Sequence, residues 1–509
     1  MPASPATTAP ADKMTGQFDS LDHRTRTLLE APLLPLLLRL STPNVVLMLA
    51  QSATGVIETY FVGKLGTDAL AGVAIVFPGV MLMQMISGGS MGGGISSAVA
   101  RALGSGRKDD AAALVWHALA INAALGLLCC VGALLFGPPL YRALGGSGAS
   151  LRAALDYSNV IYAGAVLLWS MNALASVLRG TGNMLAPAVV VCGGAVLLIP
   201  LSPCLILGLG PMPRLGVAGG AYALVAYYVA GSAVLAWYLW SGRAVIRPRL
   251  ADIRLRARLF GAILRVGGIA SLSSMQTNLT IMLTTGMVGA FGAAALAGFG
   301  TGSRLEYLLV PIAFGIGAPL VPVVGTNMAA GQPHRAMHAA WVGAAMGFGV
   351  TEAIGIAATL FPSGWLRLFD SDPAMIASGT LYLRTVGPFY GFFGLGLVLY
   401  FASQGAGRMA WPVMAQFLRL AVAAAGAWLA LRLGWGLVGV FIAIAVGLVI
   451  YGATVSLSIA FGGWGSRRPR EAAARPAALT SLSARATAGP PRWQERPVPV
   501  RRRPDRNAA

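Results

Sequence analysis

Charged residues are scarce in this sequence and make up only 11% of its 509 amino acids. Soluble domains carry about 25% charged residues, and a soluble protein of this length needs them to cover its surface. Hydrophobic residues reach 56%, and the mean hydropathy is +0.71. The chain therefore has too few polar residues for a soluble globular fold, and its composition indicates an integral membrane protein.

Lysine, cysteine and histidine are also rare. The four cysteines lie inside apolar segments and form no CxxC pair, so neither a disulfide framework nor a zinc site is indicated. His334 and His338 are one helical turn apart, but no third ligand is near them, and we expect no metal site. The net charge of +20 comes almost entirely from arginines in loops and in one tail. Membrane proteins concentrate such residues in cytoplasmic loops, which explains this charge without nucleic-acid binding.

Apolar stretches long enough to cross a bilayer, which takes about 20 residues, occur twelve times. They cover residues 36–62, 69–98, 111–136, 151–177, 184–208, 216–240, 260–289, 293–322, 336–361, 375–402, 410–432 and 436–461. Glycine-rich turn signals, such as Gly104-Ser105-Gly106, separate several of them. The sequence therefore predicts an all-α integral membrane fold of twelve transmembrane helices.

The basic residues of the loops predict the orientation of these helices. With the N-terminus in the cytoplasm, the five internal cytoplasmic loops hold 12 Lys and Arg, whereas the six outer loops hold 6. Because basic residues favour the cytoplasmic side, we expect both termini inside the cell and the protein in the inner (plasma) membrane.

The two halves of the chain resemble each other. FVGKLGTDALAGVA at 61–74 shares seven of fourteen residues with MVGAFGAAALAGFG at 287–300, an offset of 226. An offset of 225 aligns a second pair of segments and also pairs Tyr157 with Tyr382. Each copy holds six helices, so the copies share one topology and are related by an axis along the membrane normal. This parallel repeat is a design of secondary transporters, with a cavity between two lobes.

The repeat divides the chain into five parts. These are a polar N-terminal tail at 1–30, an N-lobe at 31–241, a basic cytoplasmic linker at 242–259, a C-lobe at 260–462 and an Arg-rich tail at 463–509. The last part carries 11 arginines against three acids and has no apolar period. We expect it to be disordered and suited to contact with anionic lipid.

Several motifs make the sequence resemble the MATE (multidrug and toxic compound extrusion) family. The first helix carries Pro43 and the segment Glu58-Thr-Tyr-Phe-Val-Gly-Lys-Leu-Gly66. RGTG and QGAG turns follow the fourth and tenth helices, and Ser303-Arg-Leu-Glu306 lies in the eighth. The resemblance covers residues 31–462 and implies a multidrug efflux transporter that uses an ion gradient and no cofactor. The same superfamily includes flippases of lipid-linked sugars.

Glu58 is the first candidate for the ion-coupling site. An ionised carboxylate inside a membrane span is costly unless it is paired or hydrated, so such residues are usually functional. Gln51 and Thr54 precede Glu58 by seven and four residues, so all three share one face of the helix. The resemblance implies a proton or sodium site here, where the family usually has Asp, and adds a fourth-helix Asn that Asn172 matches. The alternative is an acid at the membrane interface, because Glu58 lies near the outer end of its span.

Around Glu58 the sequence departs from the family. Where some members have a fifth-helix Asn and Asp, this chain has Leu198 and Ser202, and Leu224 replaces a sixth-helix Thr. Hard cations need several oxygen ligands, whereas a lone carboxylate can bind and release a proton. We therefore expect coupling to the proton motive force, with Na⁺ less favoured.

Polar residues of the C-lobe are candidates for the substrate cavity. Glu306 lies about 20 Å along its helix, near the midplane, as a cation-attracting or protonatable group or as one partner of a buried ion pair. Gln276 and Asn278 fall where some relatives place an acid, and they either line the cavity or bridge helices. Glu352 has no motif support, so we expect a structural role for it.

The second helix supplies two further candidates, Gln84 and Met85. They belong to residues 79–94, which are rich in glycine and methionine. The small residues predict close helix packing. The thioethers suit an adaptable binding wall, or they simply fill space.

These observations predict a drug/proton antiporter that exports amphipathic, often cationic small molecules and works as a monomer in the lipid bilayer. Each lobe would rock about the central cavity, and protonation of Glu58 would lower the affinity for the substrate's positive charge. The alternative is a flippase for a lipid-linked or amphipathic metabolite, to which Arg304 and Arg384 could contribute positive charge. No catalytic cluster such as HExxH accompanies these residues, so we do not expect an enzyme.

Overall fold

The structure is a computed structural model. It describes residues 22–249, 253–462 and 464, apart from the side chains at 52–54, 56, 57 and 307. The predicted basic tail at 463–509 therefore lies outside the described residues, with the exception of Trp464.

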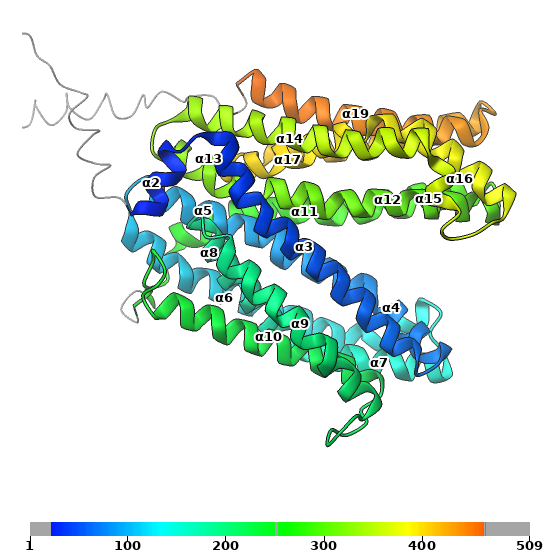
Figure 1. Cartoon of the computed structure of the whole chain (residues 1–509), viewed down its shortest axis with the longest axis horizontal. Coiled ribbons are helices and arrows are strands. Elements are labelled where there is room, and N and C mark those ends of the chain that lie inside the picture. Colours follow the sequence, from blue (N-terminus) through cyan, green and yellow to red (C-terminus); the bar gives the residue numbers. More distant parts are fainter. Residues whose placement is uncertain (1–21, 250–252, 463, 465–509) are drawn as a thin grey trace, which may run out of the picture. The chain divides into compact units, whose positions relative to one another are not determined.

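The first half of the described chain forms a bundle of helices, the N-lobe, after one short helix (Figure 1). The short helix is α2 (His23–Glu30). The N-lobe consists of α3 (Leu33–Gly63), α4 (Thr67–Gln84), the π-helical turn η1 (Met85–Met91), α5 (Gly92–Gly104), α6 (Lys108–Ala143), α7 (Gly148–Ala163), α8 (Ala165–Gly180), α9 (Leu185–Leu207) and α10 (Val217–Trp240).

The second half repeats this arrangement as the C-lobe. It consists of α11 (Ala257–Gly289), α12 (Ala293–Gly317), α13 (Leu320–Ala329), α14 (Pro333–Leu360), α15 (Pro362–Leu366), α16 (Pro373–Val386), the 3₁₀ turn η3 (Gly387–Phe389), α17 (Tyr390–Ala406), α18 (Ala410–Arg432) and α19 (Gly436–Ala460). In Figure 1 these helices run alongside one another, as those of the N-lobe do.

The predicted fold of twelve spans in two six-helix lobes is confirmed. Four spans are interrupted: the second consists of α4, η1 and α5, the fourth of α7 and α8, the eighth of α12 and α13, and the tenth of α16, η3 and α17. Among the described residues, ten helices or joined helices are long and apolar enough to cross a membrane, and the pair α7–α8, bent by 46°, makes an eleventh. The twelfth is α11, whose 33 residues are long enough but carry Ser, Thr, Gln and Asn in the middle.

The two lobes pack closely at one end of the bundle, which we call the closed end. Gly94 of α5 lies directly against the backbone of Gly267 in α11, because a Cβ at position 94 would be only 2.7 Å from the Gly267 nitrogen. The hydroxyl of Ser97 donates to the carbonyl oxygens of Gln404 and Gly405 in α17. The prediction of close packing by the small residues of the second span is therefore confirmed.

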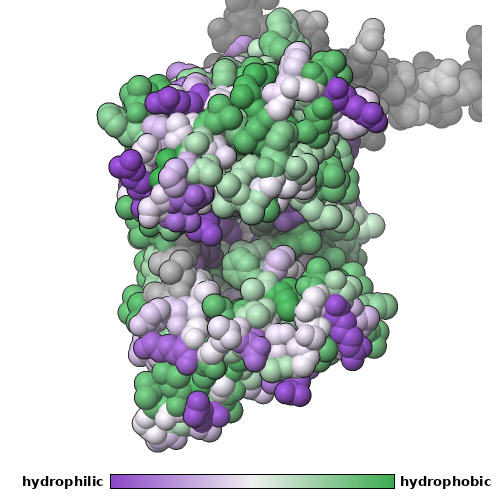
Figure 2. Space-filling model, turned by 90° about the vertical axis from the view of Figure 1, so that its right-hand side faces the viewer, coloured by the Kyte–Doolittle hydropathy of each residue, from purple (hydrophilic) through white to green (hydrophobic). Residues whose placement is uncertain are grey.

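At the opposite end the lobes are apart. Figure 2 looks onto that face and shows the surface hollowed between an upper and a lower half. In Figure 1 the helices of the two lobes diverge toward α7 and α16. The structure is thus a state in which the space between the lobes is closed at one end and accessible from the other.

The segment between the lobes is attached to the N-lobe helix α6. Asp110 pairs with Arg258 at 2.8 Å and with Arg256 at 3.6 Å. The backbone N–H of Arg256 also donates to Nε2 of His117, at 2.8 Å. The described end of the predicted linker (242–259) therefore lies against α6 at Arg256 and Arg258, and α11 begins inside the predicted range, at Ala257.

Part of the predicted polar N-terminal tail is helical. Leu28 of α2 is buried in one apolar cluster with Leu320 of α13 and Leu399 of α17. The side-chain amide of Asn327 donates to the Leu28 carbonyl oxygen at 3.0 Å. Residues 23–30 are thus packed against the C-lobe at the closed end.

Candidate ion-coupling site

Glu58 lies within α3 and forms a hydrogen-bonded pair with Tyr157 of α7. The Tyr157 hydroxyl donates to Oε1 of Glu58 over 2.9 Å. The ring of Tyr157 is buried, whereas Glu58 is half-buried. Because a hydroxyl donor stabilises a carboxylate and can also serve a protonated one as a partner, this pair suits a group that gains and loses a proton.

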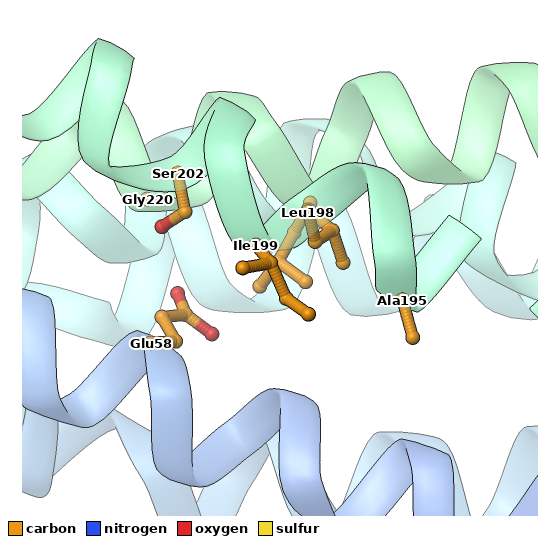
Figure 3. Close-up of a pocket in the computed structure, with 7 residues that line it drawn as sticks. Glu58, Ala195, Leu198, Ile199, Ser202 and Gly220 are labelled. Atoms are coloured by element: carbon orange, nitrogen blue, oxygen red, sulfur yellow. The ribbon is translucent and has the colours of Figure 1, made fainter. Parts of the chain in front are cut away.

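A pocket opens beside this carboxylate (Figure 3). It is lined by Glu58, Ala195, Leu198, Ile199, Ser202, Gly220 and Leu224. Figure 3 shows Glu58 pointing from α3 toward Ser202 of α9 and Gly220 of α10. The missing side chain of Gly220 provides room, because a Cβ there would lie 3.1 Å from Oε1 of Glu58. Apart from Glu58 itself, only Ser202 among these lining residues has a side-chain oxygen.

The other residues predicted for this site lie in different surroundings. Gln51 is exposed on the surface of α3. The side chain of Thr54 lies outside the described residues. The amide of Asn172 donates to the hydroxyl of Ser87 in η1, at 3.0 Å, and so joins α8 to the second span. Within the described part of the chain, the hydrogen-bonding partner of Glu58 is thus Tyr157.

The two candidates from the second helix, Gln84 and Met85, lie in different environments. The side-chain amide of Gln84 donates to the Tyr228 hydroxyl of α10 at 3.3 Å, inside the N-lobe. Met85 is 40% exposed. Gln84 is therefore part of the polar interior of the N-lobe, and Met85 is a surface residue in this state.

Glu306 of α12 has surroundings that resemble those of Glu58. It accepts a hydrogen bond from the hydroxyl of Tyr382 in α16. Tyr382 is 1% exposed and packs edge-on against Phe299 and Phe441. The one cation that acts electrostatically on Glu306 in the described chain is Arg419 of α18. The C-lobe thus holds a carboxylate, a tyrosine and an arginine in its interior.

The amides of α11 form contacts within and between helices. Gln276 is buried, and its amide donates to the hydroxyl of Thr280 and to the Gln416 carbonyl oxygen of α18, both at 2.8 Å. Asn278 donates to the Ser274 carbonyl oxygen of its own helix at 2.9 Å. For Gln276 these contacts match the alternative of an amide that bridges helices.

Three functional candidates in the structure were not assigned to a site by the sequence analysis: Tyr157, Tyr382 and Arg419. Tyr157 and Tyr382 had been paired by the repeat, but nothing local marks them as partners of a carboxylate. Arg419 lies inside the apolar stretch 410–432, and a charged residue in such a stretch could have been recognised as a functional candidate from the sequence. Arg304 and Arg384, which had been considered instead, are both exposed.

A membrane bundle of two repeated six-helix lobes, with carboxylates inside its spans, is typical of secondary transporters. The sequence pattern of the MatE family matches residues 43–204 and 270–429, which is more than half of the chain. The chain belongs to the MatE family, so it is a multi-pass membrane transporter and not an enzyme.

Curated relatives cover most of its length. A protein from Shewanella oneidensis named FAD transporter is 29% identical over 378 residues, which make up 74% of this chain and 82% of that protein. A probable multidrug resistance protein NorM from Thermotoga maritima is 24% identical over 385 residues, 75% of this chain and 82% of the relative.

Solved structures have the same fold. A MOP superfamily transporter from Pyrococcus furiosus, described as having a binding pocket of reverse polarity, superposes with a TM-score of 0.80 at 25% identity, covering 87% of this chain and 98% of the other. A crystal structure of MATE in complex with MaL6 superposes with a TM-score of 0.79, also at 25% identity, and covers 90% and 100% of the two chains.

Proposed function

We propose that this chain exports amphipathic, often cationic small molecules in exchange for protons, with Glu58 as the proton carrier. The observation that carries this proposal is the Glu58–Tyr157 pair, in which a carboxylate inside a membrane helix faces a pocket with apolar walls. A charged group is costly in such a place, so it is retained where binding or release of an ion requires it. The pocket leaves space next to the carboxylate through which a proton or water can reach it.

The lining of the pocket favours a proton over Na⁺. A hard cation is held by several oxygen ligands. Leu198 and Leu224 line the pocket where further oxygens would be needed, and Ser202 contributes one hydroxyl. A proton needs only the carboxylate, and Tyr157 is a partner for it before and after protonation.

Coupling then follows from the two ends of the lobe interface. The prediction from basic residues assigns the closed end to the cytoplasm, with both termini there, in the inner membrane. Substrate would leave through the end that is hollowed in Figure 2. A proton entering from that side neutralises Glu58 and removes the negative charge that attracts a cationic substrate, so proton entry promotes release outside.

The experiment is export of ethidium, a fluorescent cation, from proteoliposomes that contain the purified chain. An imposed pH gradient should drive transport, whereas a Na⁺ gradient at equal pH should not. Transport driven by Na⁺ alone would contradict proton coupling. Failure of both gradients, in protein that is monodisperse, would contradict the antiporter itself.

An alternative class of substrate carries negative charge. Lipid-linked metabolites belong to this class, and so does FAD, which appears in the name of the relative from Shewanella oneidensis. Arg304 and Arg384 give this alternative little support, because both are exposed, and Arg304 stacks on Phe369 at 5.3 Å. The observation that favours it is a different arginine in the interior of the C-lobe.

A further inference from the structure

Arg419 is an ionisable residue in the middle of a transmembrane helix. It is the ninth residue after Ala410 in α18, about 14 Å along a helix about 35 Å long. A guanidinium at this depth is expensive unless it faces a cavity or a partner, and intramembrane arginines therefore mark binding sites and ion pathways. The position of Arg419 therefore indicates a binding site or an ion pathway in the C-lobe.

The guanidinium of Arg419 lies next to two aromatic rings. The group lies over the ring of Phe393 in α17, at 5.6 Å, and near the ring of Tyr451 in α19, at 5.9 Å. Among the residues that the structure describes, it makes no hydrogen bond and no ion pair. Its contacts with the two rings are cation–π contacts and not hydrogen bonds, so the five N–H donors of Arg419 stay available for a planar anion.

Glu306 does not take these donors. Its carboxylate accepts the hydroxyl of Tyr382, and it acts on Arg419 only through space. Two other buried polar atoms of the C-lobe interior have no hydrogen bond of normal geometry within the described chain: Oε1 of Gln416 and the hydroxyl of Tyr390, whose neighbour is the Tyr382 side chain. Tyr390 interacts electrostatically with Glu306, and the amide nitrogen of Gln416 lies 3.4 Å from the Tyr451 hydroxyl. Arg419 and Gln416 thus share the neighbour Tyr451, and Arg419 and Tyr390 share the neighbour Glu306, so hydrogen-bonding capacity is left for a polar ligand in this part of the C-lobe.

We propose that Arg419 binds the anionic group of amphipathic substrates that carry a phosphate or a carboxylate. The guanidinium would hold the anion in a bidentate contact, and the hydroxyl of Tyr390, which like Arg419 interacts with Glu306, would be a second donor. The neighbouring rings of Phe393 and Tyr451 stabilise its positive charge inside the helix bundle. This inference rests on the proposed function as an exporter of amphipathic molecules. It extends the substrates from cations to anions, with Glu58 of the N-lobe serving cations and Arg419 of the C-lobe serving anions.

Flavins provide a probe in which only the charge changes. Riboflavin, FMN and FAD share one fluorescent ring system, but riboflavin has no phosphate. With the purified full-length chain in nanodiscs of phosphatidylcholine, FMN and FAD should bind at least about tenfold more tightly than riboflavin, as expected for hydrogen bonds to a charged group. Arg419→Gln should remove this preference and leave riboflavin binding in place, whereas Arg419→Lys should retain part of it.

The matched control is Arg432→Gln. Arg432 belongs to the same helix and also stacks on an aromatic ring, that of Trp428 at 5.3 Å, but it is exposed at the end of α18. This variant should keep the full preference for phosphate. Retained riboflavin binding by Arg419→Gln distinguishes a lost anion contact from a misfolded protein.

Three outcomes would overturn the proposal. They are equal affinity of the parent for riboflavin and FMN, no flavin binding by protein that transports ethidium, and an unchanged preference in Arg419→Gln. A lipid headgroup as the true ligand is tested by nanodiscs that contain phosphatidylglycerol: loss of FMN affinity there would assign the site to lipid. Equilibrium binding needs no ion gradient, so failure of proton coupling leaves this result intact, and the two proposals fail separately.

Discussion

Tyr157 and Tyr382 hold equivalent positions in the two halves of the chain, and the hydroxyl of each donates a hydrogen bond to a carboxylate. The carboxylates are not equivalent. Glu58 belongs to the first span of its lobe, whereas Glu306 belongs to the second span of the other, and the offset of 226 places Thr284 at the counterpart of Glu58. The tyrosine donor therefore occupies the same position in both halves of the chain, whereas the carboxylate acceptor does not. Of these two carboxylates, Glu306 alone has an arginine of the described chain acting on it, which indicates different tasks for the two lobes.

The proton-coupling proposal predicts that Glu58→Gln abolishes export driven by a pH gradient. The amide resembles the protonated acid and cannot carry a proton, and it is less costly in an apolar setting, so membrane insertion should stay near normal. Glu58→Asp keeps the charge but shortens the reach to Tyr157, and it should retain partial or full activity. The measurement is ethidium export from proteoliposomes at matched protein content.

Glu352→Gln is the control for that experiment. Glu352 is another acid in a membrane helix, and its carboxylate accepts the backbone N–H of Gly391 at 2.7 Å. Glu352→Gln should therefore have only a small effect on ethidium export. If Glu58→Gln transports like the parent and Glu306→Gln is inactive, the coupling site belongs to the C-lobe.

The two tyrosines give a matched pair of variants. Tyr157→Phe removes the only hydrogen bond donor to Glu58 in the described chain, and a bond to a charged group is worth about 1.5–3 kcal/mol. We expect proton-driven export to fall by about tenfold or more. Tyr382→Phe removes the corresponding donor to Glu306 and should affect ethidium export less. Equal effects of the two variants on transport rate, at equal thermal stability, would argue against the N-lobe as the site of coupling.

The number and order of the helices could be predicted because a long apolar run is a local signal that the bilayer itself requires. Glu58 could be predicted for the same reason, since an acid inside such a run stands out. Arg419 could have been predicted in the same way, because it is a charged residue inside the apolar stretch 410–432. The sequence thus contains the ionisable groups of both lobes.

The partners of these groups could not be predicted, because they depend on how distant segments pack. Tyr157 is 99 residues from Glu58, and tyrosines in membrane helices have many other uses. Gln51 was assigned to the site because it shares a helical face with Glu58, but it is exposed in the structure. A shared face specifies direction and not depth of burial, and burial depends on the neighbouring helices.

The basic tail is expected to be dispensable for transport. Trp464 is buried against the C-lobe, but the residues after 465 are rich in arginine and proline and have no apolar period with which to pack. Truncation after residue 465 should leave ethidium export and membrane levels unchanged. Complete loss of export at a normal membrane level would instead assign the tail a direct role.

Adjacent glycines in α11 provide the sharpest test of the closed end. A Cβ at Gly267 would lie 2.9 Å from Sδ of Met91 and 3.1 Å from its Cα, whereas a Cβ at Gly268 would have nothing within 4 Å. Gly267→Ala should therefore push the lobes apart at a cost of about 1–3 kcal/mol, as overpacking does. Gly268→Ala adds the same methyl group to open space and should be close to neutral.

The readout is the accessibility of Ser97, which is fully buried at the closed end. In a chain whose native cysteines are replaced, Ser97→Cys should react slowly with a maleimide. Adding Gly267→Ala should speed this reaction and reduce export, because the state closed at this end is populated less. Adding Gly268→Ala should change neither quantity. Were both alanine variants to react at the same rate, the close packing of Gly267 against Met91 would not be what holds this end closed.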